Sequence, residues 1–497
     1  MGKLDAQIDG SAKTALVALC LFVTRLRERL PEAAALSLGV LLRISMATTY
    51  DVARGFDFNT HWPYLQYIAL HGALPPLDLN AAAYHPPLYY LIGAALVKLG
   101  LGPGALGWLA ALLGVCRLVV VWIGLERWLP ESRLARVVAL FTAAVLPVGV
   151  QLDGMVSNET LSTLLCALAL VAAPAAVEAA RAGRSKPVAW LALWLGLALI
   201  TKVSATVLVL ALLLALALDL WRAPESWRQA LRLRWKPFAI GAAIVVALSG
   251  WFFVRNQVLY GQPAPTGYEG ALRANQAPYE AIPYLYRRTA GFYWQWDGAI
   301  FGYPYAPIGY WPEPRFFPVL VASTFADYYS YMFATWALTT PSLLIAHRPI
   351  PVLAFDLSCL SVIGGTVIAL LTLLAWFGAV RALRRRPADP RPVLLVAPLL
   401  ALLGQMHFAT KYPDDDFGPI KGAYLQFVAP ILCGLFGLAV AWMWRRARAR
   451  AGAVAALGAL LLVLVYTVDC RLPRFGLGAS RAAPIFHTGH ATGHASR

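Results

Sequence analysis

The sequence predicts an all-α polytopic membrane protein, and three observations support this fold class. Of its 497 residues, 59% are hydrophobic and only 13% are charged, whereas a soluble domain carries about 25% charged residues. Apolar stretches long enough to cross a bilayer recur along the whole chain. The short connections between alternate stretches are rich in arginine and lysine, as is typical of cytoplasmic loops. Because backbone polar groups must be satisfied within lipid, the spans should be helices.

About eleven transmembrane helices are expected, with the N-terminus in the cytoplasm. They cover residues 31–50, 105–126, 135–151, 158–178, 188–201, 203–219, 237–254, 357–380, 392–409, 422–444 and 452–469. Nearly all of the net charge of +17 then falls on the inside loops, so membrane topology explains it and no nucleic-acid partner is needed. Residues 85–100 are also apolar, but counting them as a span would move the later basic loops outside. We therefore expect a juxtamembrane helix in the outer interface there.

These spans divide the chain into five parts. They are a cytoplasmic segment at 1–30, a transmembrane module at 31–254 that includes the first outer loop at 51–104, a periplasmic cap at 255–356, C-terminal transmembrane helices at 357–470 and a periplasmic tail at 471–497. The cap is rich in tyrosine and tryptophan, unlike a flexible linker, so we expect it to be ordered over the outer face. The three histidines of the tail, 487, 490 and 494, either bind a metal or, as we prefer, form part of a frayed polar end.

The first outer loop holds the strongest candidate for a catalytic group. Asp57 comes soon after the first span, so its carboxylate should lie at the boundary between membrane and water. His61 follows one helical turn later and can share its helix face. Alternatively, Asp57 only caps an interfacial helix, and residue types alone leave both interpretations open.

Several stretches in chain order carry a family resemblance. They are Asp57 with His61 and Tyr64 to Tyr67, GALP (72–75), YHPPLYY (84–90), LDGMVSNETL (152–161), LGLALITK (195–202), GWFFVRNQVLYGQP (250–263) and IKGAYLQFVAP (420–430). Together they resemble the GT-C superfamily of glycosyltransferases, which use polyprenyl-phosphate-linked sugars and include protein O-mannosyltransferases and the lipid A aminoarabinose transferase. The resemblance extends over most of residues 31–445. It implies a GT-C-type bundle in the cell inner membrane with a periplasmic active site.

The resemblance also implies a mechanism. Asp57 would be the catalytic base that deprotonates an acceptor hydroxyl as its oxygen attacks the anomeric carbon, with inversion. The leaving group is a lipid phosphate, so the site must supply positive charge rather than a strong acid. The family often shows two adjacent acids in this loop, but Phe58 follows Asp57 here. Asp153, on the next outer turn, is therefore the expected second catalytic carboxylate.

Further site residues are expected on the same face. The candidates for contact with the lipid phosphate are His85, Lys202, Arg255 and Lys421. The candidates for sugar or acceptor binding are His61, Glu159, Asn256, Trp294, Trp296 and Tyr424. Such cations also serve as interfacial anchors, and such aromatic residues as a membrane-interface belt, so these alternatives stay open.

No cofactor is assigned, and a divalent cation stays open. The metal candidates are Asp57, Asp153 and Glu159. Weaker acidic candidates lie in the cap and in a later turn: Asp297, Glu313, Asp327 and the run Asp414–Asp416. Arg117 falls in the middle of a predicted span, so it either faces the bundle or marks a misplaced boundary.

The expected function is a membrane glycosyltransferase that moves a sugar from a polyprenyl-phosphate donor to a glycan, lipid or protein acceptor. One alternative is an O-antigen-type polymerase or ligase acting on a lipid-linked glycan. Another is a lipid or glycan transporter or flippase. A transporter should carry ionisable residues near the middle of the membrane in broken helices, whereas most of the ionisable candidates here gather at one face.

Overall fold

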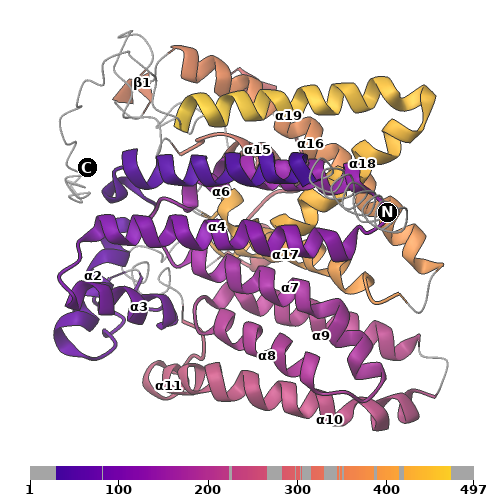
Figure 1. Ribbon diagram of the computed structural model, residues 1–497. Helices are drawn as coiled ribbons and strands as arrows, with labels where there is room; N and C mark the ends of the chain where they lie inside the picture. The colour runs from indigo at the N-terminus through magenta and orange to yellow at the C-terminus, as the bar shows by residue number, and fades with distance from the viewer. Residues whose placement is uncertain are drawn as a thin grey trace, which may run out of the picture.

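The structure is a computed structural model that describes residues 29–80, 82–222, 226–265, 282–296, 298–302, 304, 315–329, 344–345, 348–349, 352–385, 389–413 and 419–471. Long helices run roughly side by side through the molecule (Figure 1). The α-helices are a first helix Arg29–Thr49, α2 (Phe58–His71), α3 (Leu88–Lys98), α4 (Pro103–Trp128), α5 (Arg133–Val145), α6 (Pro147–Leu152), α7 (Glu159–Arg181), α8 (Lys186–Leu199), α9 (Thr206–Trp221), α10 (Trp227–Val245), α11 (Trp251–Tyr260), α14 (Ala290–Trp294), α15 (Phe316–Phe325), α16 (Val352–Arg384), α17 (Pro392–Lys411), α18 (Ala429–Arg445) and α19 (Arg450–Arg471). The shorter elements are the 3-10 turns η1 (Val52–Arg54), η2 (Val203–Ala205), η4 (Tyr284–Tyr286), η5 (Gly298–Phe301), η6 (Gly422–Leu425) and η7 (Ala447–Ala449), the π-helix η3 (Val246–Gly250), and the antiparallel pair β1 (Leu344–Ile345) and β2 (Arg348–Pro349).

Eight described helices are long and apolar enough to cross a membrane. This confirms a helical multi-pass membrane protein, but it does not confirm a count of eleven spans. The other predicted spans are short or broken helices. α8 has 14 residues, about 21 Å, which is less than the roughly 30 Å of the hydrocarbon core. The predicted span 135–151 is divided into α5 and α6 because Pro147 disfavours helical geometry at the residue before it.

The first outer loop forms two helices, α2 and α3, at one end of the bundle (Figure 1). α3 has 11 residues, about 16 Å, so it is too short to cross a bilayer and fits the helix expected at 85–100. The two helices pack through Tyr64 and Tyr90, whose ring centroids are 3.8 Å apart. The amide of Leu88 donates a hydrogen bond of 3.0 Å to the carbonyl of Ile200 after α8. The loop is thereby fixed to the bundle.

Residues 419–428, which precede α18, pack on α15. The amide of Gly422 donates a hydrogen bond of 2.9 Å to Ser323 Oγ. A Cβ atom on Gly422 would lie 2.7 Å from Thr324 Cα, so only glycine permits this close approach. The same packing places the neighbouring Lys421 side chain 5.0 Å from the ring centroid of Phe56 in the first outer loop.

The described parts of the predicted cap are fastened to the C-terminal end of α17. Arg287 donates a hydrogen bond of 3.0 Å to the carbonyl of Lys411, and the hydroxyl of Tyr284 lies 2.8 Å from His407 Nδ1. Other sequence candidates lie outside the described residues: Asp297, Glu313, Asp414–Asp416 and histidines 487, 490 and 494.

The other end of the bundle is held by an ion-pair cluster between α7, α9 and α10. Asp219 of α9 accepts a hydrogen bond of 3.0 Å from Arg181 Nε on α7. Arg234 Nη1 on α10 lies 2.6 Å from the second oxygen of the same carboxylate. All three side chains are at least partly buried, so this cluster joins three helices where the predicted topology places the cytoplasm.

Candidate active site

Asp57 lies immediately before α2 in an unusual backbone conformation. With φ of 56° and ψ of 24°, it is the only non-glycine residue with positive φ among the described residues. Its carbonyl oxygen accepts hydrogen bonds of 2.9 Å from the amides of Thr60 and His61, which start the helix. Its side chain makes no capping hydrogen bond. The capping interpretation is therefore wrong, and such a strained conformation is typical of functional sites.

Two lysines from distant parts of the chain act on the Asp57 carboxylate. Lys421 has the largest effect and lowers the pKa of Asp57 below its ordinary value, outweighing desolvation, which acts in the opposite direction. Lys202 acts in the same sense as Lys421. Asp57 is also exposed. At neutral pH it is therefore an accessible, ionised carboxylate next to two cationic side chains.

Tyr424 and Glu159 complete this group of charged residues. The Lys202 ammonium is 5.3 Å from the ring centroid of Tyr424 and forms an ion pair with Glu159. The Lys421 ammonium is 6.0 Å from the same ring. The structure thus brings five predicted site residues together, and we call Asp57, Glu159, Lys202, Lys421 and Tyr424 the outer-end cluster.

The predicted site histidines lie in a neighbouring aromatic group. His61 is buried, and its Nδ1 is 2.7 Å from the hydroxyl of Tyr90. The rings of His61 and His85 stack with centroids 5.7 Å apart. Burial lowers the pKa of His61 to about 4 and that of His85 well below its ordinary value. Without a bound anion, both rings are therefore neutral near pH 7, and contact of His85 with a phosphate stays a prediction.

Acid is expected to destabilise the protein through His61. The folded state keeps His61 neutral down to about pH 4, whereas an unfolded chain protonates it near pH 6.5. Stability is therefore full above pH 6.5 and decreases as the pH falls toward 4, by about 2–3 kcal/mol for this residue. H61Q should show a correspondingly smaller decrease in unfolding free energy between pH 7 and 4.5, measured by denaturant titration in one detergent. H71Q, which changes an exposed histidine of the same helix, should behave like the wild type; equal losses in all three would contradict the prediction.

Arg255 lies beside α2, whereas the two predicted tryptophans do not reach the cluster. Arg255 is an electrostatic neighbour of Tyr64, and its guanidinium donates a hydrogen bond of 3.1 Å to the side chain of the buried Asn256. Trp294 and Trp296 are 75% and 43% exposed. Their ring contacts are with neighbouring cap residues, so the structure does not bring them to Asp57.

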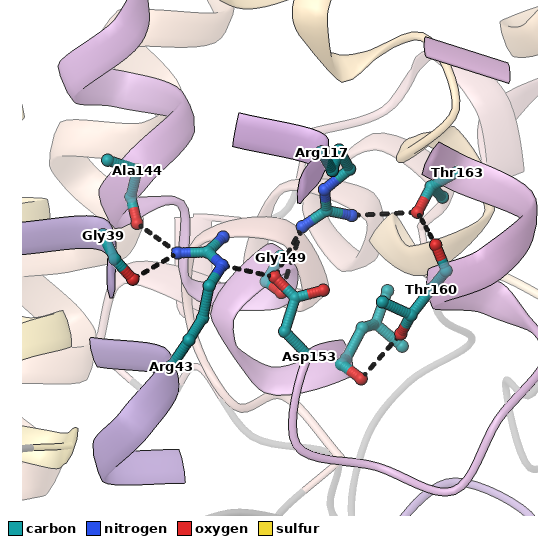
Figure 2. Close-up of polar contacts among 9 residues, drawn as sticks. Gly39, Arg43, Arg117, Ala144, Gly149, Asp153, Thr160 and Thr163 are labelled. Atoms are coloured by element: carbon teal, nitrogen blue, oxygen red, sulfur yellow. Dashed lines mark hydrogen bonds and ion pairs between the residues drawn. The ribbon is translucent and has the colours of Figure 1, made fainter. Parts of the chain in front are cut away.

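Asp153 is held inside the bundle rather than in the outer-end cluster. Figure 2 shows its carboxylate between Arg43 of the first helix and Arg117 of α4. Each guanidinium approaches Asp153 Oδ2 to 2.8 Å, and the Asp153 and Arg43 side chains are fully buried. Arg117 also donates a hydrogen bond of 3.0 Å to Thr163 Oγ1 on α7. The structure thus gives Asp153 a helix-joining role instead of the predicted catalytic one, and Arg117 faces the bundle.

The three metal candidates, Asp57, Asp153 and Glu159, do not form a joint metal-binding group in the described part of the chain. No three His, Cys, Asp or Glu side chains in the described part of the chain come together as a metal-binding group. Each of the three metal candidates has cationic neighbours instead: Asp57 has two lysines, Glu159 has Lys202, and Asp153 has two arginines. A metal ion at any of them would compete with positive charge already present.

Sequence reasoning missed two contributors to these arrangements. Tyr84 lies among the charges of Asp57, Lys421 and Glu159, which all affect the pKa of its hydroxyl. The signal was its place in YHPPLYY, directly before His85. Arg43 lies within the first predicted span, and the signal was that a buried cation normally requires a buried anion.

Comparisons with known proteins find distant structural likeness only. No protein-family model matches the sequence, and no curated protein matches it. Among solved structures, it is similar to the Archaeoglobus fulgidus oligosaccharyltransferase tethered to an acceptor peptide that contains the NVT sequon, with 12% identity and a TM-score of 0.49 over 88% of this chain and 55% of that chain. A structure of the same archaeal enzyme with Zn and sulfate gives 13% identity and a TM-score of 0.49 over 88% and 53%. The chain spans about half the length of the archaeal enzyme.

Proposed function

We propose that this protein is a membrane glycosyltransferase that transfers a sugar from a polyprenyl-phosphate donor to an acceptor hydroxyl at the end of the bundle that holds α2 and α3. The observation that carries the proposal is the exposed, ionised Asp57 next to Lys421 and Lys202. A carboxylate and two ammonium groups are what a base-assisted displacement of a phosphate requires. Both lysines stand in stretches that carry the resemblance to the GT-C superfamily.

In this mechanism Asp57 is the general base. The acceptor hydroxyl gives its proton to the carboxylate while its oxygen forms a bond to the anomeric carbon. The bond between that carbon and the phosphate oxygen breaks on the opposite side, so the configuration inverts. Lys421 favours the ionised form of the Asp57 carboxylate before the reaction. The ionised carboxylate can accept the proton of the acceptor hydroxyl, which becomes more acidic as its oxygen attacks.

The lipid phosphate is held by the cations of the site. Lys421 and Lys202 lie next to Asp57, and they stabilise the negative charge that grows on the departing phosphate. Glu159 is paired with Lys202 and fixes the direction of its ammonium group. Arg255, which lies beside Tyr64 of α2, is the third candidate for the phosphate.

The sugar is assigned to an aromatic ring of the outer-end cluster, and the acceptor to exposed aromatic residues of the cap. The Tyr424 ring faces both lysines and offers a surface on which the apolar face of a sugar can stack. Trp294 and Trp296 are exposed and are proposed for the acceptor side. The periplasmic placement of this site follows from the positive-inside rule.

The proposal is tested by donor consumption. Purified protein in lipid vesicles is given synthetic polyprenyl-phosphate donors carrying hexoses, pentoses or amino sugars, together with membrane lipid and glycan extracts as acceptors. One donor class should be cleaved to polyprenyl phosphate, and the product should have the opposite anomeric configuration by NMR. Consumption of only diphosphate-linked oligosaccharides would instead indicate a polymerase or ligase. Movement of intact donor across the bilayer without cleavage would indicate a flippase.

A further inference from the structure

The first turns of α10 present two exposed stripes of different chemistry. Residues four apart share one side of a helix, and each stripe is built from three such positions. The apolar stripe consists of Trp227, Leu231 and Trp235, and the basic stripe of Arg228, Arg232 and Lys236. All six are exposed. The third side of the helix, with Ala230, Arg234 and Pro237, is buried against the bundle. The exposed side of this segment therefore carries an apolar stripe and a basic stripe next to each other.

The length of the helical run places these stripes at the depth of lipid headgroups. From Trp227 to Tyr260 the helix has 34 residues, about 51 Å, which exceeds the roughly 30 Å of the hydrocarbon core. No charged residue occurs between Lys236 and Arg255, and these two are about 28 Å apart along the helix axis. With that apolar section in the core, residues 227–236 lie in the headgroup region of one leaflet.

The charge of the basic stripe is not compensated within the described chain. No ion pair of Arg228, Arg232 or Lys236 with a described residue is present, and residues 226–260 contain no acidic residue. Arg234, the fourth cation of the segment, faces inward to Asp219. The inward and outward cations thus differ: Arg234 pairs with a carboxylate of its own chain, whereas the side chains of the basic stripe are exposed on the outer surface of the helix.

We propose that residues 227–236 of α10 form a binding surface for anionic phospholipids. The basic stripe contacts headgroup phosphates, while the indole rings of the apolar stripe enter the boundary between headgroups and acyl chains, as amphipathic aromatic residues prefer. The Arg228 guanidinium lies 5.4 Å from the Trp227 ring centroid, so the two stripes are in contact. This arrangement matches a phospholipid, in which the phosphate lies close to the first methylene groups of the acyl chains.

This surface is separate from the proposed transfer site. α11, which continues α10 beyond the π-helix, lies at the end of the bundle that holds α2 and α3, and α10 extends to the opposite end (Figure 1). Arg255 of α11 is next to α2, whereas Arg234 of α10 belongs to the ion-pair cluster at the far end. Lipid binding at the stripes can therefore be measured whether or not the protein transfers a sugar.

The test is lipid binding to the full-length protein in detergent, followed by native mass spectrometry. Phosphatidylglycerol and phosphatidylcholine are titrated in parallel. The wild type should bind phosphatidylglycerol more tightly, and R228Q/R232Q/K236Q should lose about five-fold for each cation removed, roughly 100-fold in total. Binding of phosphatidylcholine should not change. R228K/R232K retains the charge and should retain the binding, which separates loss of charge from disturbed folding.

The matched control removes three cations at the connection between α18 and α19. R445Q/R446Q/R448Q changes exposed arginines at and just after the C-terminal end of α18. These three arginines are not spaced four residues apart, so they do not form a stripe along one helix side. If the stripe arrangement determines binding, this variant should weaken phosphatidylglycerol binding less than five-fold. Equal losses in the two triple variants, or a wild type without preference for phosphatidylglycerol, would overturn the proposal.

Discussion

Asparagine at position 57 is expected to slow donor cleavage about 1,000-fold while leaving the stability of the protein unchanged. Removal of a general base typically costs a factor of about 10²–10⁴. Asparagine has nearly the same shape as aspartate and tolerates the left-handed backbone conformation that Asp57 adopts. The D57N substitution therefore removes the carboxylate without disturbing the start of α2. The measurement is single-turnover release of polyprenyl phosphate from the donor identified in the panel.

Two further variants separate the backbone from the carboxylate at this position. D57G should fold normally, because glycine also adopts positive φ, but should be as slow as D57N. D57A should be equally slow and about 1 kcal/mol less stable, because a Cβ without a polar group is strained there. Asp51 provides the matched control, since it is exposed and its contacts, a cap of the short turn η1 and an ion pair with Arg54, are local. D51N should keep the wild-type rate; a D57N rate above one tenth of the wild type would exclude Asp57 as the base.

Asparagine at position 153 is expected to reduce the free energy of unfolding by about 3–5 kcal/mol, the largest stability effect that we predict. The substitution keeps the shape of the side chain but leaves Arg43 and Arg117 buried without their shared counter-charge. Two like charges would then face each other inside the bundle. The measurement is denaturant-induced unfolding in detergent, followed by tryptophan fluorescence.

The cause of that loss can be separated from a loss of packing. The triple substitution R43M/D153L/R117M replaces all three charges by apolar side chains of similar volume, and it should restore most of the lost stability. D219N changes the corresponding carboxylate at the other end of the bundle, where Asp219 is less completely buried, and should cost less. A D153N protein within 1 kcal/mol of the wild type would contradict the assigned role of Asp153.

The sequence predicted the membrane fold and much of the outer-end cluster because these depend on charge and position along the chain. Loop charge determines orientation, so the placement of residues at one membrane face could be inferred without coordinates. Lys202 and Lys421, taken from separate stretches, both act on the Asp57 carboxylate, and Glu159 from a third stretch pairs with Lys202. Each of these three residues lies at the end of an apolar segment, and this position can be recognised in the sequence.

The contacts that buried side chains make inside the bundle could not be predicted from charge and position along the chain. Asp153 and Lys202 were both expected at the outer face, yet Asp153 turns inward because α6 ends in a tight turn that directs its side chain toward Arg43 and Arg117. The neutral state of His85 likewise results from tertiary burial, which no spacing reveals. The division of one predicted span at Pro147 follows a local rule, and a proline in an apolar run was the available signal.

The most direct measurement of the central claim is equilibrium binding of a polyprenyl-phosphate sugar to D57N and K421Q. If the outer-end cluster holds the lipid phosphate next to Asp57, the two variants should change affinity in opposite directions. D57N should bind the donor as tightly as the wild type or more tightly, because a negative charge near the phosphate is lost. K421Q should bind roughly ten-fold more weakly, because a charge-assisted contact worth about 1.5 kcal/mol or more is lost. Unchanged affinity in K421Q, or weaker binding in D57N, would contradict this assignment.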